Sequence, residues 1–223
     1  MTMIKKAILP VAAAALLMAC NNNTSGDAAQ TAAAGQAANA DGIAFAIDTT
    51  TTEIGWVGAK PTGVHTGTFS VTDGTLAVNE NGITAGNFTI NIGDMQVTDL
   101  QGEDKAKLEG HLKSPDFFDA ASYPTATFVI TSVAPYDSTQ IATKLPGATH
   151  LISGNLTMKD STVNITFPAK VQVAEGSVLA EADFQIDRTQ WGMNYKGPNN
   201  PADWMIKKEV ELKLNLKAAQ QAL

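Results

Sequence analysis

The sequence predicts an all-β domain that follows a targeting segment and a spacer. Three observations support this fold class: long runs in which apolar and polar residues alternate, turn signals between those runs, and only one stretch with helical spacing. Alternation with a period of two gives each strand one dry face and one wet face. Antiparallel strands of this kind favour a closed barrel or a sandwich, and closure removes edges that would pair with another chain.

Composition excludes several classes of protein. The chain has 223 residues and a formal net charge of −7, which suggests one domain or a small pair. A nucleic-acid-binding protein needs a basic surface to displace counterions, so the acidic balance argues against that class. A chain with one Cys cannot form an intramolecular disulfide, a Cys-rich zinc site or a Cys-ligated iron–sulfur cluster.

Residues 1–19 are expected to form a lipoprotein signal peptide. Two lysines precede an apolar run at residues 7–18, which is too short to cross a bilayer core of roughly 30 Å as a helix and suits a secretory signal. The sequence Leu17-Met18-Ala19-Cys20 resembles the bacterial lipobox, in which the cysteine receives a diacylglyceryl group, becomes the first residue after cleavage and is then acylated. The alternative is an ordinary signal peptide that happens to end near a cysteine.

Lipidation of Cys20 would anchor the protein to a membrane without a span, because two or more acyl chains give stable anchoring. The signal and the anchor together predict a periplasmic, lipid-anchored protein. By resemblance to other bacterial lipoproteins, the residue after the cysteine influences sorting. Asn21 is not the Asp associated with inner-membrane retention in enterobacteria, which favours the outer membrane.

Residues 20–42 are predicted to be the lipidated cysteine and a flexible spacer. Residues 21–42 contain no apolar side chain larger than that of Ala, so they cannot bury enough surface to offset the entropy of ordering them. As a random coil the spacer would reach roughly 25 Å. A short Ala-rich helix is the alternative. The folded domain is expected to cover residues 43–223.

The strands are predicted in order from their alternating runs. Apolar residues alternate with polar or small ones at 43–47, at 163–171, at 178–186 and, in the longest run, from Trp204 and Ile206 through Leu216. Turn signals separate the runs. They are Asp73-Gly74, Asn81-Gly82, Lys159-Asp160-Ser161 and Glu175-Gly176.

One helix is predicted, at residues 103–113. Leu108 and Leu112 are four positions apart and therefore share a helix face. Acidic residues at its start and Lys113 at its end suit the helix dipole, and Ser114-Pro115 ends it.

Four sequence blocks carry a resemblance to the YceI family of bacterial lipocalin-like proteins. Their order and spacing agree with the family, and the match covers the domain from about Ile43 to Leu216. The blocks are residues 58–69 with His65-x-Gly67-x-Phe69, His111-Leu112-Lys113-Ser114-Pro115-Asp116-Phe117-Phe118-Asp119 followed by residues 123–128, Ser153-Gly154-Asn155-Leu156-Thr157-Met158-Lys159-Asp160, and Asp187-Arg188-Thr189-Gln190-Trp191-Gly192-Met193.

The resemblance implies an extended eight-stranded antiparallel lipocalin-like barrel whose interior holds a long-chain isoprenoid lipid, such as a polyprenyl lipid or a quinone tail. About eight strands enclose room for packed side chains or one small ligand, so the periodicity is compatible with this fold. No cofactor is predicted, and a homodimer is plausible for the family but cannot be deduced from one chain.

Large apolar residues of the dry interior, together with two that follow the helix, are candidates for the ligand-contacting lining. The alternative is ordinary core packing, and Phe117 and Phe118 could either close one end of the barrel or hold the helix down. The candidates are Trp56, Phe69, Phe117, Phe118, Phe128, Leu156, Phe167, Phe184 and Trp191.

Three cationic or titratable residues fall in phase with apolar faces and are candidates for binding a polar head group. They are His65, Arg188 and Lys208. A cation on a dry face is costly unless it is paired or lies at a wet mouth, and the planar fork of Arg suits phosphate. The alternatives are that Arg188 pairs with an acid, that Lys208 lies outside a shorter strand and that His65 is structural.

The sequence carries no recognised catalytic motif. It contains no Gly-x-Ser-x-Gly elbow and no phosphate-binding Walker loop, and its three His lack metal-ligand spacing. Together with the family resemblance, which implies the ligand, this predicts a membrane-anchored periplasmic binding protein, not an enzyme, that carries or sequesters a polyisoprenoid or isoprenoid quinone. The alternatives are an enzyme that acts on such a lipid and an envelope-stress scaffold protein with no ligand.

Overall fold

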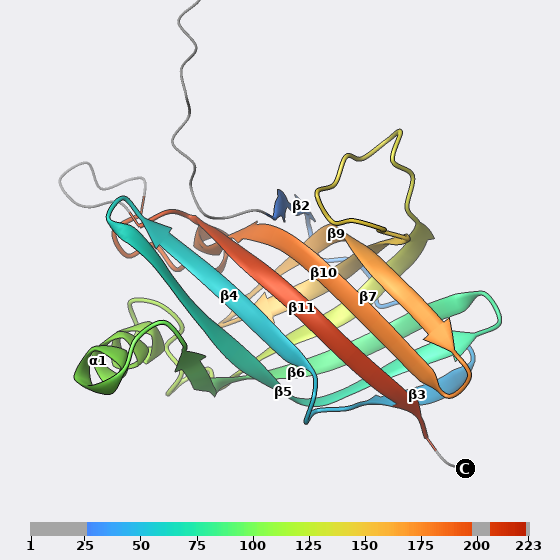
Figure 1. The fold of residues 1–223 in the computed structure, drawn as a ribbon, viewed down its shortest axis with the longest axis horizontal. Coiled ribbons are helices and arrows are strands. Elements are labelled where there is room, and N and C mark those ends of the chain that lie inside the picture. Colours follow the sequence, from blue (N-terminus) through green and yellow to red (C-terminus); the bar gives the residue numbers. More distant parts are fainter. Residues whose placement is uncertain (1–25, 198–205, 222–223) are drawn as a thin grey trace, which may run out of the picture.

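Eight antiparallel strands form a closed barrel in the computed structural model, which describes residues 26–197 and 206–221 (Figure 1). Each strand pairs with the next along the chain, and β11 pairs with β4 to close the ring, with Leu212 opposite Trp56. The eight strands are β4 (Glu53–Lys60), β5 (Gly63–Asn79), β6 (Gly82–Val97), β7 (Thr125–Pro135), β8 (His150–Met158), β9 (Ser161–Ala174), β10 (Ser177–Asp187) and β11 (Glu209–Gln220). The predicted fold class is confirmed.

Three of the four alternating runs predicted from the sequence fall wholly in strands, and the longest one falls there in part. Residues 43–47 form β3 (Ile43–Ile47), which extends the wall beyond the start of β4 by pairing with both β5 and β11. The other runs lie in β9, β10 and β11, although Trp204 lies outside the described residues and β11 begins only at Glu209. Glu211, one of the polar residues that alternate with the apolar ones in the last run, is fully buried, with one carboxylate oxygen 3.0 Å from Lys213 Nζ.

One of the four turn predictions is wrong. Asp73-Gly74 lies inside β5, where the register with β6 shifts between Val71 and Asp73, and is a bulge in a continuous strand. A Cβ on Gly74 would lie 2.7 Å from Ile47 Cγ1, so the glycine is needed for close packing. The other three signals do join consecutive strands.

The single α-helix, α1 (Gly102–Lys113), matches the predicted range and ends at the extended residue Ser114. It covers one end of the barrel beside β5 and β6 (Figure 1). The carboxylate of Glu109 on this helix accepts a hydrogen bond from the backbone N–H of Val97 at the end of β6 (2.8 Å). This contact ties the helix to the barrel wall.

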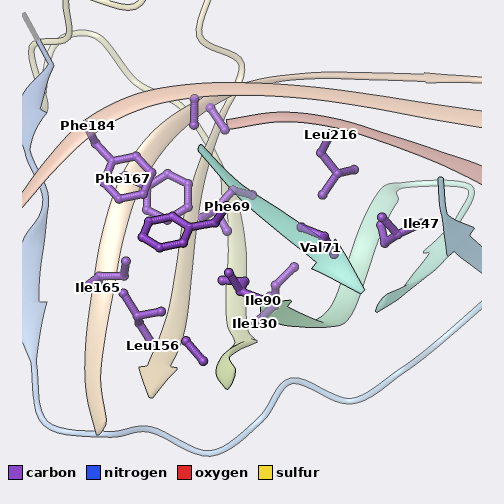
Figure 2. Packing of buried hydrophobic residues seen from close by; sticks show 14 of the residues in the cluster. Ile47, Phe69, Val71, Ile90, Ile130, Leu156, Ile165, Phe167, Phe184 and Leu216 are labelled. Carbon is purple, nitrogen blue, oxygen red and sulfur yellow. The ribbon is translucent and has the colours of Figure 1, made fainter. Parts of the chain in front are cut away.

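The hydrophobic core is the inside of the barrel. Figure 2 shows side chains from several strands pointing inward, with the rings of Phe167 and Phe184 stacked. Their centroids are 4.0 Å apart and their planes 9° from parallel. Because apolar surface leaves water at roughly 25 cal/mol per Å², this inward face stabilises the closed sheet.

The described part of the predicted flexible spacer lies along the outside of the barrel. Residues 26–41, here called the strap, begin with two short strands, β1 (Asp27–Ala28) and β2 (Gln30–Ala32). β1 pairs in parallel with β10 and β2 pairs antiparallel with β9. The direct ladder between β9 and β10 covers only residues 170–174 and 177–181, and the strap supplies the pairing beyond it.

The strap then runs across β8, β7 and β6 as far as β5. Its contacts are Gly35 N–H with Asn155 Oδ1 (3.0 Å), Asn155 Nδ2–H with Gly35 O (2.7 Å), Ala38 N–H with Ile130 O (2.9 Å), Thr84 Oγ1–H with Asp41 O (2.7 Å) and Asn79 Nδ2–H with Asp41 Oδ2 (2.9 Å). The prediction of a free spacer is therefore wrong for residues 26–41. Backbone pairing at a strand edge needs no large apolar side chain, so the composition argument did not anticipate it.

Candidate functional site

The barrel encloses a cavity of about 600 Å³ that opens at the end covered by α1. A second cavity of about 110 Å³ lies deeper, and its lining among the described residues is entirely apolar. The two share lining residues, which are Ile54, Ile90, Leu156 and Leu212, and so follow one another inside the barrel. The larger volume is in the usual range for a small-molecule site.

Glycines on the inner wall make room for two of the lining rings. A Cβ on Gly67 would clash with the indole of Trp56, and one on Gly154 would clash with the ring of Phe128. This packing gives a physical reason for the glycine in the stretch His65-x-Gly67-x-Phe69. The rings therefore lie against the wall and leave the space beside them unfilled.

Most of the predicted lining residues do border the cavities. Trp56, Phe69, Phe117 and Phe118 line the larger one. Phe128, Phe167 and Phe184 line the deeper one, and Leu156 borders both. Their contact with a ligand stays a prediction.

Trp191 lines neither cavity. It lies in the short 3-10 helix η1 (Arg188–Trp191), is fully buried, and its indole N–H donates to the backbone carbonyl of Leu156 (3.0 Å). The strand periodicity that placed it in the interior stops at Asp187, where β10 ends. Trp191 therefore packs as part of the wall.

The cavity mouth is built from three parts of the chain. They are α1 with the loop that follows it, the β4–β5 hairpin, and the irregular segment between β10 and β11. The last two are joined directly, because Lys207 N–H donates to Ala59 O (2.8 Å). Tyr195 joins the first and third, since its ring lies 4.7 Å from that of His111 and 5.4 Å from that of Phe117.

Arg188 holds this irregular segment in place. It is 3% exposed, and its guanidinium lies 5.7 Å from the centroid of Phe117. Four of its five N–H groups are used by backbone carbonyls. Nε donates to Lys207 O (3.1 Å), Nη1 to Met193 O, and Nη2 to Tyr195 O (3.0 Å) and Ile206 O (3.2 Å).

These contacts change the interpretation of Arg188. The alternative in which Arg188 pairs with an acid is wrong, because its guanidinium donates its hydrogen bonds to backbone carbonyls and not to a carboxylate. Burial lowers the pKa of Arg188, and the nearby charge of Asp187 opposes that effect. With one N–H group left, Arg188 is placed to position the mouth, and direct head-group contact by it stays a prediction.

Lys208 lies outside the cavity, as the alternative interpretation expected. It precedes β11 by one residue, its side chain is 45% exposed, and its Nζ lies 2.9 Å from Asp187 Oδ2. The hydrogen bond and charge of Asp187 raise the pKa of Lys208. The structure does not bring Lys208 to the site.

Two histidines at the mouth are each paired with an aspartate. His65 Nδ1 lies 2.9 Å from Asp99 Oδ2, and His111 Nε2 lies 3.1 Å from Asp116 Oδ2. Burial alone would raise the pKa of Asp99, but hydrogen bonds from Thr66 N–H and from His65 outweigh it and lower that pKa. Both histidines line the cavity, so His65 lies where the sequence predicted.

Sequence reasoning missed several polar residues at the mouth. They are Lys60, Thr62, His111, Tyr195, Lys196 and Lys207. Most lie in turns or in the irregular segment, where no periodicity reports which way a side chain points. The one available signal was their position beside the family blocks around His65, His111 and Arg188.

In the described residues, no helix combines the length and the apolarity that crossing a bilayer requires. Within the same ranges, no group of three or more His, Cys, Asp or Glu side chains is arranged to hold a metal ion. Cys20 lies outside the described residues, so its lipidation stays a prediction.

Comparisons with known proteins agree with this geometry. The model of the YceI-like domain family matches residues 45–218. Protein YceI of Escherichia coli O157:H7 is 28% identical over 162 residues, which are 70% of this chain and 74% of that protein. BcnA of Burkholderia cenocepacia has a similar structure, with a TM-score of 0.60, 20% identity and coverage of 78% of this chain and 99% of BcnA.

A second solved structure with this fold is a polyisoprenoid binding domain from Saccharophagus degradans implicated in plant cell wall breakdown. Its TM-score is 0.58 at 17% identity, covering 80% of this chain and 99% of that domain. At this identity the likeness shows a shared fold.

Proposed function

The chain belongs to the YceI family, and on that premise we propose that it binds a long apolar ligand, a polyisoprenoid or isoprenoid quinone, for carriage or sequestration. The observation that carries the proposal is the cavity of about 600 Å³, which continues into a wholly apolar one of about 110 Å³. A long hydrocarbon tail fits this arrangement because apolar lining with few polar anchors favours partition from water. A fold neighbour described as a polyisoprenoid binding domain also supports it.

The proposal includes a place for the protein. Lipidation of Cys20 would hold the barrel on the periplasmic side of a membrane, with Asn21 favouring the outer membrane. Intact-mass measurement of the protein extracted from membranes tests this part. A mature chain that begins at Cys20 and carries diacylglyceryl and acyl groups supports it, and a cleaved chain without lipid contradicts it.

Mass spectrometry of co-purified material tests the ligand. The mature chain from residue 20 onward, with Cys20→Ser, is secreted behind a cleavable signal peptide, and native and denatured spectra are compared. A stoichiometric isoprenoid supports the proposal. A barrel that stays empty after incubation with quinones and polyprenyl phosphates contradicts it.

A matched pair of variants on β7 links binding to the cavity. Ala126 lines the larger cavity, so Ala126→Trp should fill part of it and lower isoprenoid occupancy at least about tenfold, because ligand and indole compete for one volume. Ala134 lies on the same strand but is exposed, and Ala134→Trp should leave occupancy unchanged. Equal occupancy in both variants would place the ligand elsewhere.

A further inference from the structure

The barrel wall has a seam between β9 and β10. These strands pair directly only through residues 170–174 and 177–181, and the described residues beyond that ladder, 161–169 and 182–187, do not pair with each other. The strap lies in the seam, with β1 paired to β10 and β2 paired to β9. Each of the two long strands also has a partner on its other side, since β9 pairs with β8 and β10 with β11. The strap therefore completes the wall without being needed to hold either strand.

Hydrogen bonds hold the strap in the seam, and little apolar burial supports them. The structure describes all of residues 26–41, and among these only Gly26 is buried. Ala29 N–H donates to Gln185 O on β10 (2.9 Å), and residues 30–32 pair in register with β9. Few buried apolar contacts and hydrogen bonds close to water are typical of segments that open locally while the rest of the protein stays folded. The strap can therefore leave the seam at a much lower free energy than unfolding requires.

The loop between β7 and β8 fastens the first part of the strap. Asp27 Oδ2 accepts hydrogen bonds from Thr143 Oγ1–H (2.9 Å) and from the backbone N–H of Lys144 (2.5 Å). Hydrogen bonds to an ionised carboxylate are stronger than those between neutral groups. This single side chain therefore sets much of the stability of the closed strap. Among the described residues that line the two cavities, neither Asp27 nor any other strap residue is found.

Two aromatic rings cover the inner side of the seam (Figure 2). Phe167 belongs to β9 and Phe184 to β10, and their rings stack with centroids 4.0 Å apart. Phe184 is also the register partner of Asp27, so the rings lie behind the strap. Both rings border the deeper cavity, and Leu212, which pairs in register with Phe184, borders both cavities. Without the strap, only side chains would separate the cavities from the outside here, and side chains rotate far faster than strands separate.

The seam suits a hydrocarbon tail that starts in a bilayer better than the cavity mouth does. The mouth lies under α1, and two of its walls are joined by the hydrogen bond from Lys207 N–H to Ala59 O (2.8 Å). A long tail that entered there end first would leave the bilayer before it was enclosed, and exposing its apolar surface to water is unfavourable. The proposed lipid on Cys20 lies a few residues before Gly26, so it would hold the seam beside the bilayer.

We propose that the seam is a lateral port for the hydrocarbon tail of the ligand and that the strap is its latch. The strap lifts from β9 and β10, the rings of Phe167 and Phe184 move apart, and the tail passes sideways into the deeper cavity. The inference rests on the proposed function and adds the route of entry. The family model matches residues 45–218, so the strap lies outside the matched domain. While the closed strap remains the main state, a weaker latch speeds uptake and release equally and leaves the affinity unchanged.

The release rate of a quinone tests a weakened latch. The mature chain with Cys20→Ser is loaded with a menaquinone that has a geranylgeranyl tail and mixed with phosphatidylcholine vesicles in an excess at which the rate is constant. Recovery of tryptophan fluorescence reports release, because Trp56 borders the larger cavity. Asp27→Ala should speed release about tenfold and leave the equilibrium affinity unchanged, since it removes two hydrogen bonds that hold the strap. The matched control Asp41→Ala removes the other strap aspartate, which contacts Asn79 on β5, and should not change the rate.

Engineered disulfides test a locked latch. In the Cys20→Ser chain, which has no other cysteine, Ala28→Cys with Gln185→Cys joins the strap to β10, and Gln30→Cys with Thr166→Cys joins it to β9. Both pairs are register partners on neighbouring strands, a separation that a disulfide can span. The variant with both pairs is loaded with menaquinone while reduced and is then oxidised. Oxidation should slow release at least about tenfold, and reduction should restore the rate of the parent chain.

A control disulfide closes the wall where it is already paired. Gln172→Cys with Leu179→Cys joins register partners of the direct β9–β10 ladder, and its oxidation should leave the release rate unchanged. Equal release rates of the locked variant before and after oxidation, or of Asp27→Ala and the parent chain, would overturn the port while bound menaquinone left the proposed function standing. If neither this menaquinone nor geranylgeraniol binds to the parent chain, the proposed function fails, and the port fails with it.

Discussion

Replacing Arg188 by methionine tests whether this buried cation builds the cavity mouth. The substitution keeps the apolar bulk beside Phe117 and removes every hydrogen bond to the four carbonyls. Each buried carbonyl left without a donor costs about 1–3 kcal/mol, and the lower figure applies where water can reach the loop. We therefore expect Arg188→Met to lower the free energy of unfolding by about 4 kcal/mol.

Urea denaturation followed by tryptophan fluorescence measures this change. With a slope of about 2 kcal/mol per molar urea, the midpoint should fall by about 2 M. The matched control is Lys208→Met, which removes an exposed charge outside the cavity and should leave the midpoint unchanged within error. An Arg188→Met midpoint equal to that of the wild type, together with weaker ligand binding, would refute the positioning role and favour direct contact with the ligand.

Three other changes have defined outcomes. Trp191→Phe removes the donor to Leu156 O and some buried volume, so urea denaturation should show a loss of about 2–3 kcal/mol. Asn155→Ala removes both hydrogen bonds to Gly35, and hydrogen exchange at the Gly35 amide should become faster; unchanged exchange would argue against the strap contact. Two threonine hydroxyls lower the pKa of Asp48 from 3.8 to about 2. The ionised Asp48 carboxylate therefore stabilises the fold fully above about pH 4, and this stabilisation is lost as the pH falls through about 2. In Asp48→Asn this part of the stability–pH curve should be flat.

The strands and the helix could be predicted because their signals are local. Alternation in β9, β10 and β11 reports which side chains face inward, and the spacing of Leu108 and Leu112 reports one helix face. The closed eight-stranded barrel was predicted from the family resemblance, because the sequence of one strand does not indicate which distant strand it pairs with. The bulge at Gly74 was mistaken for a turn because both features favour Gly after Asp.

The site was predictable only where regular strands supply it. Trp56, Phe69 and Phe184 border the cavities, and their inward phase on a strand is what made them predictable. Arg188 lies just past the end of β10, where the phase argument stops, and its partners are carbonyls that the sequence does not distinguish from any others. Lys207 was missed for the same reason, because the chain between β10 and β11 is irregular in its described parts.

The strap changes what membrane anchoring would mean for this barrel. A free spacer of residues 21–42 would let the barrel move roughly 25 Å from its anchor. Gly26 is instead buried against β10, and a Cβ there would lie 2.6 Å from Asp183 Oδ1, so the sheet fixes the chain from that residue onward. Six residue steps separate Gly26 from Cys20, which limits the separation to about 22 Å even at full extension. A lipid on Cys20 would therefore keep the part of the wall between β9 and β10 close to the bilayer surface, which restricts how the cavity mouth can be oriented toward its lipid source.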